Sequence, residues 1–273
     1  SNQRFIGTSN FRQNQRTYDA ISARYEHPND WRATYAYLDK VHRVFGDDSP
    51  QGHFDTRAHL LQINVSSMRY TTVDAYAYLI DLPSQPALSS LTAGARAGID
   101  YALWFNPDWT LRLTLEAAQQ RDYRSNPRDY REHYFLVEPG IQFRGLSASV
   151  GWERLDGDGV NAVQTPFVSG HLFNGLTDKF VTIPGGGLDD RYLKLTYTLG
   201  QIPAIALESI VATAAYHDFE SPTSGVSLGR EWSAGISARI NRHFSLSLEH
   251  ARYMADSFST DTNKTWATAV ASY

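Results

Sequence analysis

The chain has 273 residues and a formal net charge of −4. It contains no cysteine, which excludes a disulfide framework and any CxxC site for zinc or redox chemistry. The acidic balance argues against a nucleic-acid-binding protein, which normally has an excess of basic residues.

The chain has no run of 18 apolar residues, so no transmembrane helix is predicted. Residues 1–11 lack the cationic stretch and apolar stretch of a signal peptide. The mean hydropathy of −0.41 is compatible with a membrane β-barrel, because polar residues that face the lumen dilute the apolar residues that face lipid.

Apolar and polar residues alternate with period two through most of the chain, which predicts strands. The stretches 91–103, 109–118 and 231–240 show this pattern most clearly. Each is about ten residues or longer, whereas strands of soluble proteins average about 5–6 residues and about 9–11 tilted residues cross a bilayer. The sequence predicts about fourteen strands, at 4–13, 16–26, 31–45, 58–70, 72–82, 91–104, 109–122, 131–143, 146–155, 189–199, 204–217, 227–240, 243–254 and 265–273.

From the second strand on, short and long connections alternate. An antiparallel up-and-down barrel of the outer membrane has short periplasmic turns and long extracellular loops. We therefore predict a single all-β barrel domain over residues 1–273, located in the bacterial outer membrane, with both chain ends on the periplasmic side. A soluble β-sandwich is the alternative. The terminal Tyr273 and tryptophans near predicted strand ends favour the barrel: Trp31, Trp104, Trp109, Trp152, Trp232 and Trp266.

The predicted register directs a set of charged side chains into the lumen. These candidate pore-lining residues are Arg96, Asp100, Arg112, Glu116, Glu138, Arg144, Lys194 and Arg239. In one interpretation the arginines bind carboxylates of a passing solute with two parallel hydrogen bonds. In the other, the nearly balanced cations and acids brace the lumen by pairing with each other.

The longest connection, 156–188, is predicted to lie over or inside the pore, and its glycines Gly185–Gly187 permit a tight fold-back. It lacks the Lys and Ser/Thr of a phosphate loop. The stretch DGDG at 156–159 predicts a turn, and a calcium site at Asp156 and Asp158 is the alternative. The nine histidines form no HxH or HxxxH pair, so we expect no metal centre and no other cofactor.

The same loop and the start of the chain resemble the alginate-export family of outer-membrane barrels. The loop resembles the family through a segment that includes His171, Asn174, Asp178 and Lys179, and the start resembles it through Arg4, Phe5, Gly7, Arg12, Gln13, Asn14, Thr17, Asp19 and Ala20. The resemblance implies a barrel of about eighteen strands, of which this chain would be the C-terminal part. It also implies export of alginate or a related acidic polysaccharide, with periplasmic secretion proteins as partners.

We therefore predict an outer-membrane channel for an anionic polysaccharide, in contact with membrane lipid and lipopolysaccharide. The alternative is a general porin for small organic solutes or oligosaccharides. No reaction is required, so no catalytic residue is named. A barrel hydrolase stays open as an alternative, although no GxSxG motif occurs, and so does a soluble β-rich binding module.

Overall fold

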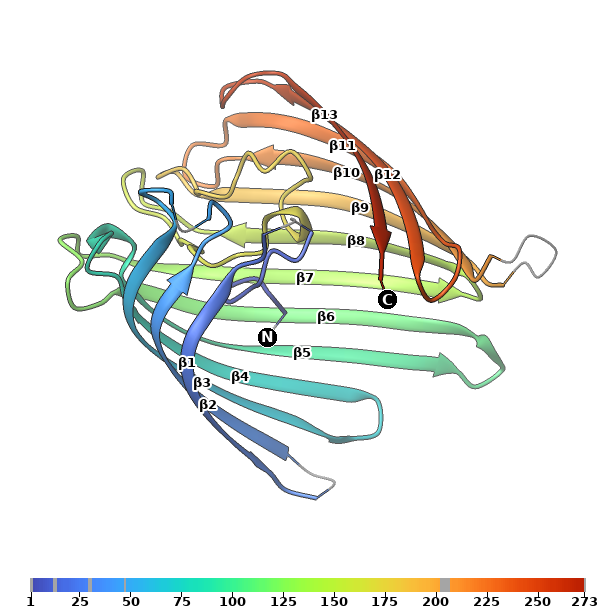
Figure 1. The fold of residues 1–273 in the computed structure, drawn as a ribbon, viewed down its shortest axis with the longest axis horizontal. Coiled ribbons are helices and arrows are strands. Elements are labelled where there is room, and N and C mark those ends of the chain that lie inside the picture. Colours follow the sequence, from blue (N-terminus) through green and yellow to red (C-terminus); the bar gives the residue numbers. More distant parts are fainter. Residues whose placement is uncertain (1, 12–13, 29–30, 47, 202–206, 273) are drawn as a thin grey trace.

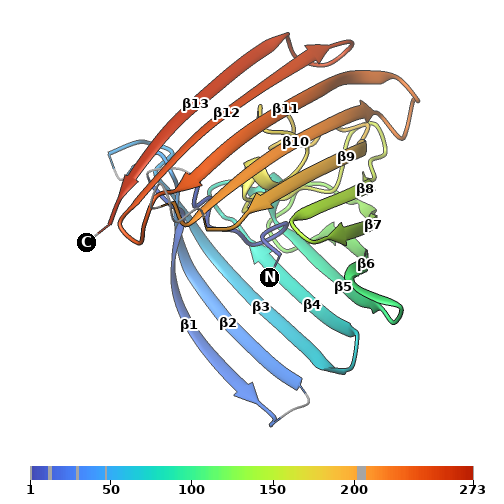
Figure 2. The same ribbon diagram turned by 90° about the vertical axis from the view of Figure 1, so that its right-hand side faces the viewer.

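The structure is a computed structural model that describes residues 2–11, 14–28, 31–46, 48–201 and 207–272. Thirteen antiparallel strands follow one another in chain order in a single sheet. The sheet curves into most of a barrel wall, with the chain's N-terminal segment and the longest loop on its concave side (Figures 1 and 2). The prediction of an all-β up-and-down barrel is thus confirmed, with thirteen strands among the described residues where about fourteen were expected.

The strands have the following bounds: β1 Thr17–Glu26, β2 Trp31–His42, β3 His53–Met68, β4 Thr71–Asp81, β5 Ser90–Leu103, β6 Asn106–Asp122, β7 Arg131–Phe143, β8 Leu146–Leu155, β9 Leu188–Leu199, β10 Ser209–Glu220, β11 Ser227–Arg239, β12 Phe244–Ala255 and β13 Thr262–Ala271. Two short 3₁₀ helices, η1 (Pro86–Leu88) and η2 (Gly170–Leu172), lie in connections. Among the described residues, no helix is long and apolar enough to cross a membrane.

The predicted strand at 4–13 is wrong. Residues 2–9, called here the N-terminal inner segment, enter the concave side, where Ile6 forms an isolated parallel bridge with Phe167. Gly7 N donates to Phe167 O at 2.8 Å. The physical reason is the burial of both Arg4 and Phe5, whose side chains cannot alternate between lipid and lumen. Residues 12–13 lie outside the described residues.

This change also corrects the predicted position of one chain end. β1 begins with Thr17 opposite His42, beside the long connection 43–52, whereas β13 ends with Ala271 opposite Phe244, beside a short turn. The first strand therefore starts at the end of the sheet that carries the long loops. Both edge strands run in the same direction.

The convex face is apolar. Large hydrophobic side chains on it are 38–53% exposed, such as Leu115, Val137, Val150 and Ile236. So much exposed apolar surface is unusual in a soluble protein and fits contact with lipid. Aromatic pairs gather at the short-turn end, where Trp109 stacks on Phe143 with ring centroids 4.3 Å apart. Trp266 departs from the predicted girdle, since it contacts His171 on the concave side.

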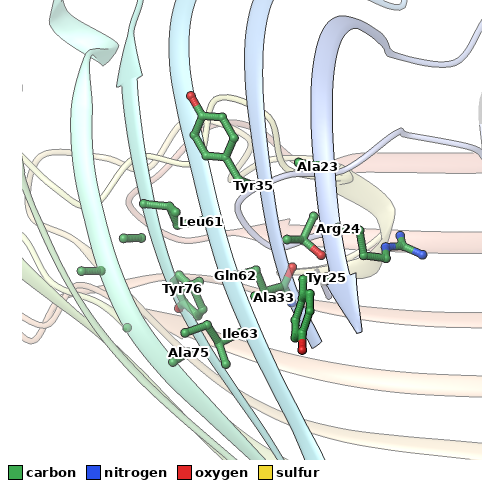
Figure 3. Close-up of a pocket in the computed structure, with 14 residues that line it drawn as sticks. Ala23, Arg24, Tyr25, Ala33, Tyr35, Leu61, Gln62, Ile63, Ala75 and Tyr76 are labelled. Carbon is green, nitrogen blue, oxygen red and sulfur yellow. The ribbon is translucent and has the colours of Figure 1, made fainter. Parts of the chain in front are cut away.

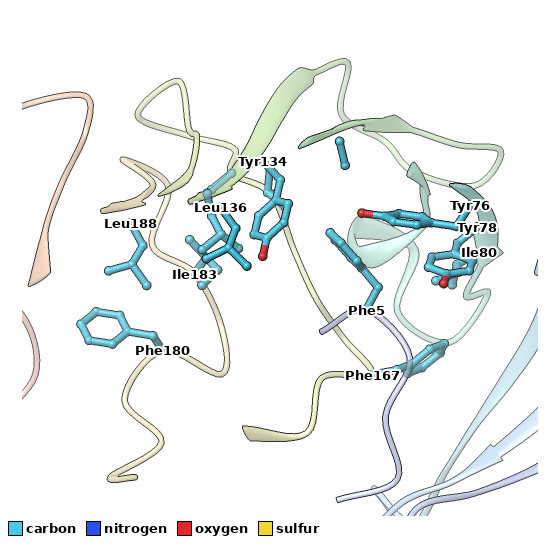
Figure 4. Close-up of a cluster of buried hydrophobic side chains, with 14 of the residues drawn as sticks. Phe5, Tyr76, Tyr78, Ile80, Tyr134, Leu136, Phe167, Phe180, Ile183 and Leu188 are labelled. Atoms are coloured by element: carbon cyan, nitrogen blue, oxygen red, sulfur yellow. The ribbon is translucent and has the colours of Figure 1, made fainter. Parts of the chain in front are cut away.

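The buried hydrophobic cluster lies on the concave side, where a barrel would have its lumen (Figure 4). Phe5 of the N-terminal inner segment packs on Tyr76, Tyr78 and Tyr134, with ring centroids 5.4–6.3 Å apart. Residues 156–187, called here the inner loop, add Phe167 and Phe180. The two inner segments therefore fold against the concave side of the wall as a packed unit.

Candidate solute pathway

The inner loop and the N-terminal inner segment are held by one buried carboxylate, that of Glu153 on β8. Arg4 Nε lies 3.1 Å from Glu153 Oε1, and both side chains are at most 3% exposed. Tyr134 Oη donates to the same oxygen at 2.7 Å, and Asn174 Nδ2 donates to Oε2 at 2.7 Å. A buried charge of this kind is stable only when paired and hydrogen-bonded, so Glu153 ties both inner segments to the wall.

Two further acids of the wall hold the inner loop. Asn174 Nδ2 also donates to Asp190 Oδ2 at 3.0 Å, and that carboxylate is hydrogen-bonded to His217 Nδ1. Glu231 on β11 accepts hydrogen bonds from Leu176 N at 2.5 Å and from the backbone and side chain of Thr177. The loop's turn is thus fixed to three neighbouring parts of the sheet.

Gly175 is required for this contact. Its φ is +88°, and a Cβ built on it would lie 2.7 Å from the Glu231 carboxylate. Glycine alone combines a left-handed backbone with so close an approach at no steric cost. The carboxylate can therefore reach the backbone N–H groups of the next two residues.

The remaining loop residues singled out from the sequence also make structural contacts. His171 stacks on Phe11 with centroids 3.7 Å apart, and its Nδ1 lies 3.1 Å from Asp178 Oδ1. Both line a hollow of about 440 Å³ beside Trp266. Lys179 Nζ donates to Ser259 Oγ at 2.9 Å, at the mouth of the sheet.

A row of polar side chains crosses the concave face on five adjacent strands. Arg32, Asn64, Asp74, Arg96 and Glu116 are directly opposed, each to the next, in the registers of β2 to β6. This polar row lines a hollow of about 290 Å³ between the wall and the N-terminal inner segment.

The acids of the polar row are saturated with donors. Glu116 accepts from Arg96 at 2.7 Å, from Tyr76 Oη at 2.7 Å and from Asn2 Nδ2 at 2.9 Å. Asp74 accepts from the side-chain amides of Gln62 and Asn64 at 3.1 and 3.0 Å.

The arginines at the β1–β2 end of this wall are different. The side chains of Arg24 and Arg32 are 62% and 47% exposed, and each lies 3.8 Å from the single carboxylate of Glu26. The hollow therefore offers hydrogen-bond donors more readily than acceptors.

The predicted pore-lining residues divide into three groups. Arg96 with Glu116, and Arg112 with Asp100 at 3.1 Å, are opposed pairs on β5 and β6. Glu138 lies 3.9 Å from Lys194, and with Arg112 it lines a second polar hollow of about 270 Å³. These pairings support the interpretation in which charges brace the lumen.

Two predicted pore-lining residues lie at the short-turn end. The prediction that Arg144 lines the pore wall is wrong. Arg144 occupies the turn between β7 and β8, with a φ of 52°, and pairs with Asp108. Arg239, the last residue of β11, lies 3.7 Å from Glu208 and is 63% exposed.

Sequence reasoning missed Arg32, Asn64 and Asp74 as lumen residues, although the alternation in their strands places all three on the polar face. It gave no special weight to Glu153 and Glu231, because their role depends on loop contacts that no local pattern reveals.

Asp158 closes the turn predicted at 156–159. It accepts hydrogen bonds from Val160 N and Asn161 N at 2.7 and 2.6 Å, and these bonds lower the pKa of its carboxyl. The described residues contain no group of three His, Cys, Asp or Glu that could hold a metal ion. A calcium requirement here stays a prediction, since turn contacts already engage the Asp158 oxygens.

A hollow of about 680 Å³ lies on the convex face over β1–β5 (Figure 3). Small outward residues such as Ala33, Ala75 and Ala77 create it between Tyr35 and Ile63. Because its lining is almost wholly apolar and faces lipid, we assign it no part in the solute pathway.

No protein-family model matches the chain, and no curated protein sequence matches it. Solved structures do match. A crystal structure of Pseudomonas aeruginosa OpdK with vanillate has a TM-score of 0.72 at 13% identity, and the match covers 98% of this chain and 72% of OpdK. Acinetobacter baumannii OccAB2 has a TM-score of 0.71 at 14% identity, covering 97% of this chain and 71% of that one. The fold is that of an outer-membrane porin.

The porin fold agrees with the predicted outer-membrane location and with the prediction that the chain is not an enzyme, since these neighbours are channels. It contradicts the alginate-export assignment, because the matching solved structures are porins such as OpdK, OpdO and OccAB2. The physical reason is that His171, Asn174 and Asp178 anchor an inward loop. The predicted polysaccharide and periplasmic partners lose their support with that assignment.

Proposed function

We propose that the chain forms a channel for small organic solutes, and that the solutes pass between the two inner segments and the wall of β1 to β6. The porin fold supports a general porin for small organic solutes, which was the alternative prediction from the sequence. The inner segments narrow the concave side to hollows of about 290 and 440 Å³. A hollow of that size suits a small molecule, since ligand sites range from about 300 to 1,000 Å³.

The polar row carries the choice of solute. Its acids already accept hydrogen bonds from protein donors, whereas Arg24 and Arg32 keep exposed guanidinium groups that share one carboxylate. Guanidinium groups match carboxylates in planar geometry and charge. We therefore infer that small carboxylates are the preferred solutes. The porin OpdK was crystallised with such a molecule, vanillate.

Replacing Arg32 with glutamine is expected to lower the flux of a small aromatic carboxylate about fivefold, which corresponds to about 1 kcal/mol for one lost charge-assisted contact. The flux of a neutral solute of equal size should stay the same. The measurement is solute uptake into proteoliposomes, with both solutes assayed on the same preparation. Arg239→Gln is the matched control, because it removes the same charge at the opposite wall.

Equal carboxylate flux through the Arg32→Gln channel and the unmodified channel would contradict carboxylate selection. If neither solute enters proteoliposomes that contain the unmodified protein, the proposal that the chain forms a channel is contradicted.

A further inference from the structure

Two arginines face each other on the convex side of the sheet. Arg121 of β6 is directly opposite Arg131 of β7, and both side chains are exposed. Gln120 of β6 donates to Gln164 O of the inner loop, and Tyr134 of β7 belongs to the buried cluster, so both face the concave side. Alternation along the two strands therefore directs Arg121 and Arg131 to the convex side. Among the described residues, neither has an ion pair within 4 Å. Like charges directly opposite each other destabilise a sheet, so this pair is unfavourable without an anion.

The neighbouring charges do not neutralise the pair. Arg154 on the next strand lies 2.5 Å from Asp189 and 3.8 Å from Asp156, so both acids are already engaged. Asp122 follows Arg121 in the sequence and Glu132 follows Arg131, so alternation directs both acids to the concave side. Asp122 Oδ1 also accepts a hydrogen bond from Tyr130 N. On the convex face, one position nearer the short-turn end than the pair, Gln119 Nε2 lies 3.1 Å from His133 Nε2.

The height of the Arg121–Arg131 pair on the barrel wall shows which layer of the membrane contacts it. On β7 the outward face is apolar from Phe135 to Phe143, where Phe143 stacks on Trp109 at the short-turn end. This span is about 27 Å of strand, or about 21 Å of height at a tilt of about 40°. The apolar band of such barrels is about 25 Å tall. Arg121 and Arg131 therefore lie just beyond the hydrocarbon, at the end that carries the long loops, at the level of lipid headgroups.

We propose that Arg121 and Arg131 form a binding site for the phosphate group of a lipid headgroup in the outer leaflet. Two guanidinium groups can clamp one phosphate with parallel charge-assisted hydrogen bonds. The acyl chains of the same lipid would lie along the apolar band beneath. The proposal rests on the porin fold in a membrane and is independent of which solute passes through the channel.

The test is binding of lipid A to the detergent-solubilised protein at low salt, measured by native mass spectrometry. The bis-phosphorylated lipid is expected to bind the unmodified protein, and the double variant Arg121→Gln/Arg131→Gln should bind it at least about tenfold more weakly. Arg69→Gln is the matched control, because Arg69 lies in the short turn at the opposite end of the sheet. It should bind as the unmodified protein does.

Three further results decide the source and the site. Dephosphorylated lipid A should bind the unmodified protein as weakly as the double variant binds the phosphorylated form. Inorganic phosphate that competes as well as the lipid would overturn a lipid site in favour of a free anion. Equal binding by the double variant, shown to be folded by its unheated gel mobility, would overturn the proposal whatever the conductance of the channel.

Discussion

The variant Glu153→Ala is expected to lower the free energy of unfolding by about 3–5 kcal/mol, because it leaves a buried charge without its partner. Arg4 is 1% exposed and keeps its charge in the protein interior. Tyr134 and Asn174 lose an acceptor at the same time. The N-terminal inner segment should then loosen from the wall and the channel should widen, while the inner loop keeps its contacts with Asp190 and Glu231. Urea unfolding in detergent and single-channel conductance in planar bilayers measure the two effects.

The control for this prediction is Glu249→Ala, which removes an acid from the concave face of β12. Among the described residues, the buried cation Arg4 pairs with Glu153 and not with Glu249. It should change the stability by less than about 1 kcal/mol. An unaltered conductance in a folded Glu153→Ala channel would show that the inner segments are held in other ways.

The second large effect concerns the inner loop at Gly175. Gly175→Ala is expected to destabilise the protein by about 1–3 kcal/mol more than Gly159→Ala, because the added methyl group meets the Glu231 carboxylate. Both glycines have a left-handed φ, +88° and +100°, but a Cβ at Gly159 has no neighbour within 4 Å. The comparison therefore cancels the backbone strain common to both and isolates the steric clash.

Thermal unfolding of the two variants in the same detergent gives the difference. If Gly175→Ala and Gly159→Ala are equally stable, the close approach to Glu231 does not hold the loop. The conductance of Gly175→Ala should also become noisy or increase, since the displaced loop no longer narrows the channel.

The wall could be predicted from the sequence almost residue by residue. β7 and β8 have the predicted bounds 131–143 and 146–155, because a strand between lipid and water must alternate along its whole length. The same reliance on alternation explains why the strand predicted at 4–13 was wrong. Its few apolar residues imitate alternation, but Phe5 packs against tyrosines in the interior, and period alone does not reveal what a face contacts.

The site was harder to predict. Alternation predicts that Arg96 and Glu116 share the polar face, but their direct opposition depends on the register of β5 and β6. The anchors of the inner segments join residues far apart in sequence, such as Arg4 and Glu153, and no local pattern predicts them. The loop segment around Asn174 suggested a family that the solved structures contradict. Its residues encode how a loop binds a wall, which is a different property from what the channel transports.

The common direction of the two edge strands restricts how the wall can be completed. β1 and β13 run in the same direction. If both free edges pair in an antiparallel way, an odd number of additional strands must fill the gap between the β13 edge and the β1 edge. Two copies inserted with the same orientation would present each other with edges that can pair only in parallel. Self-association through these edges would thus interrupt the hydrogen-bond pattern that all twelve existing strand pairs share.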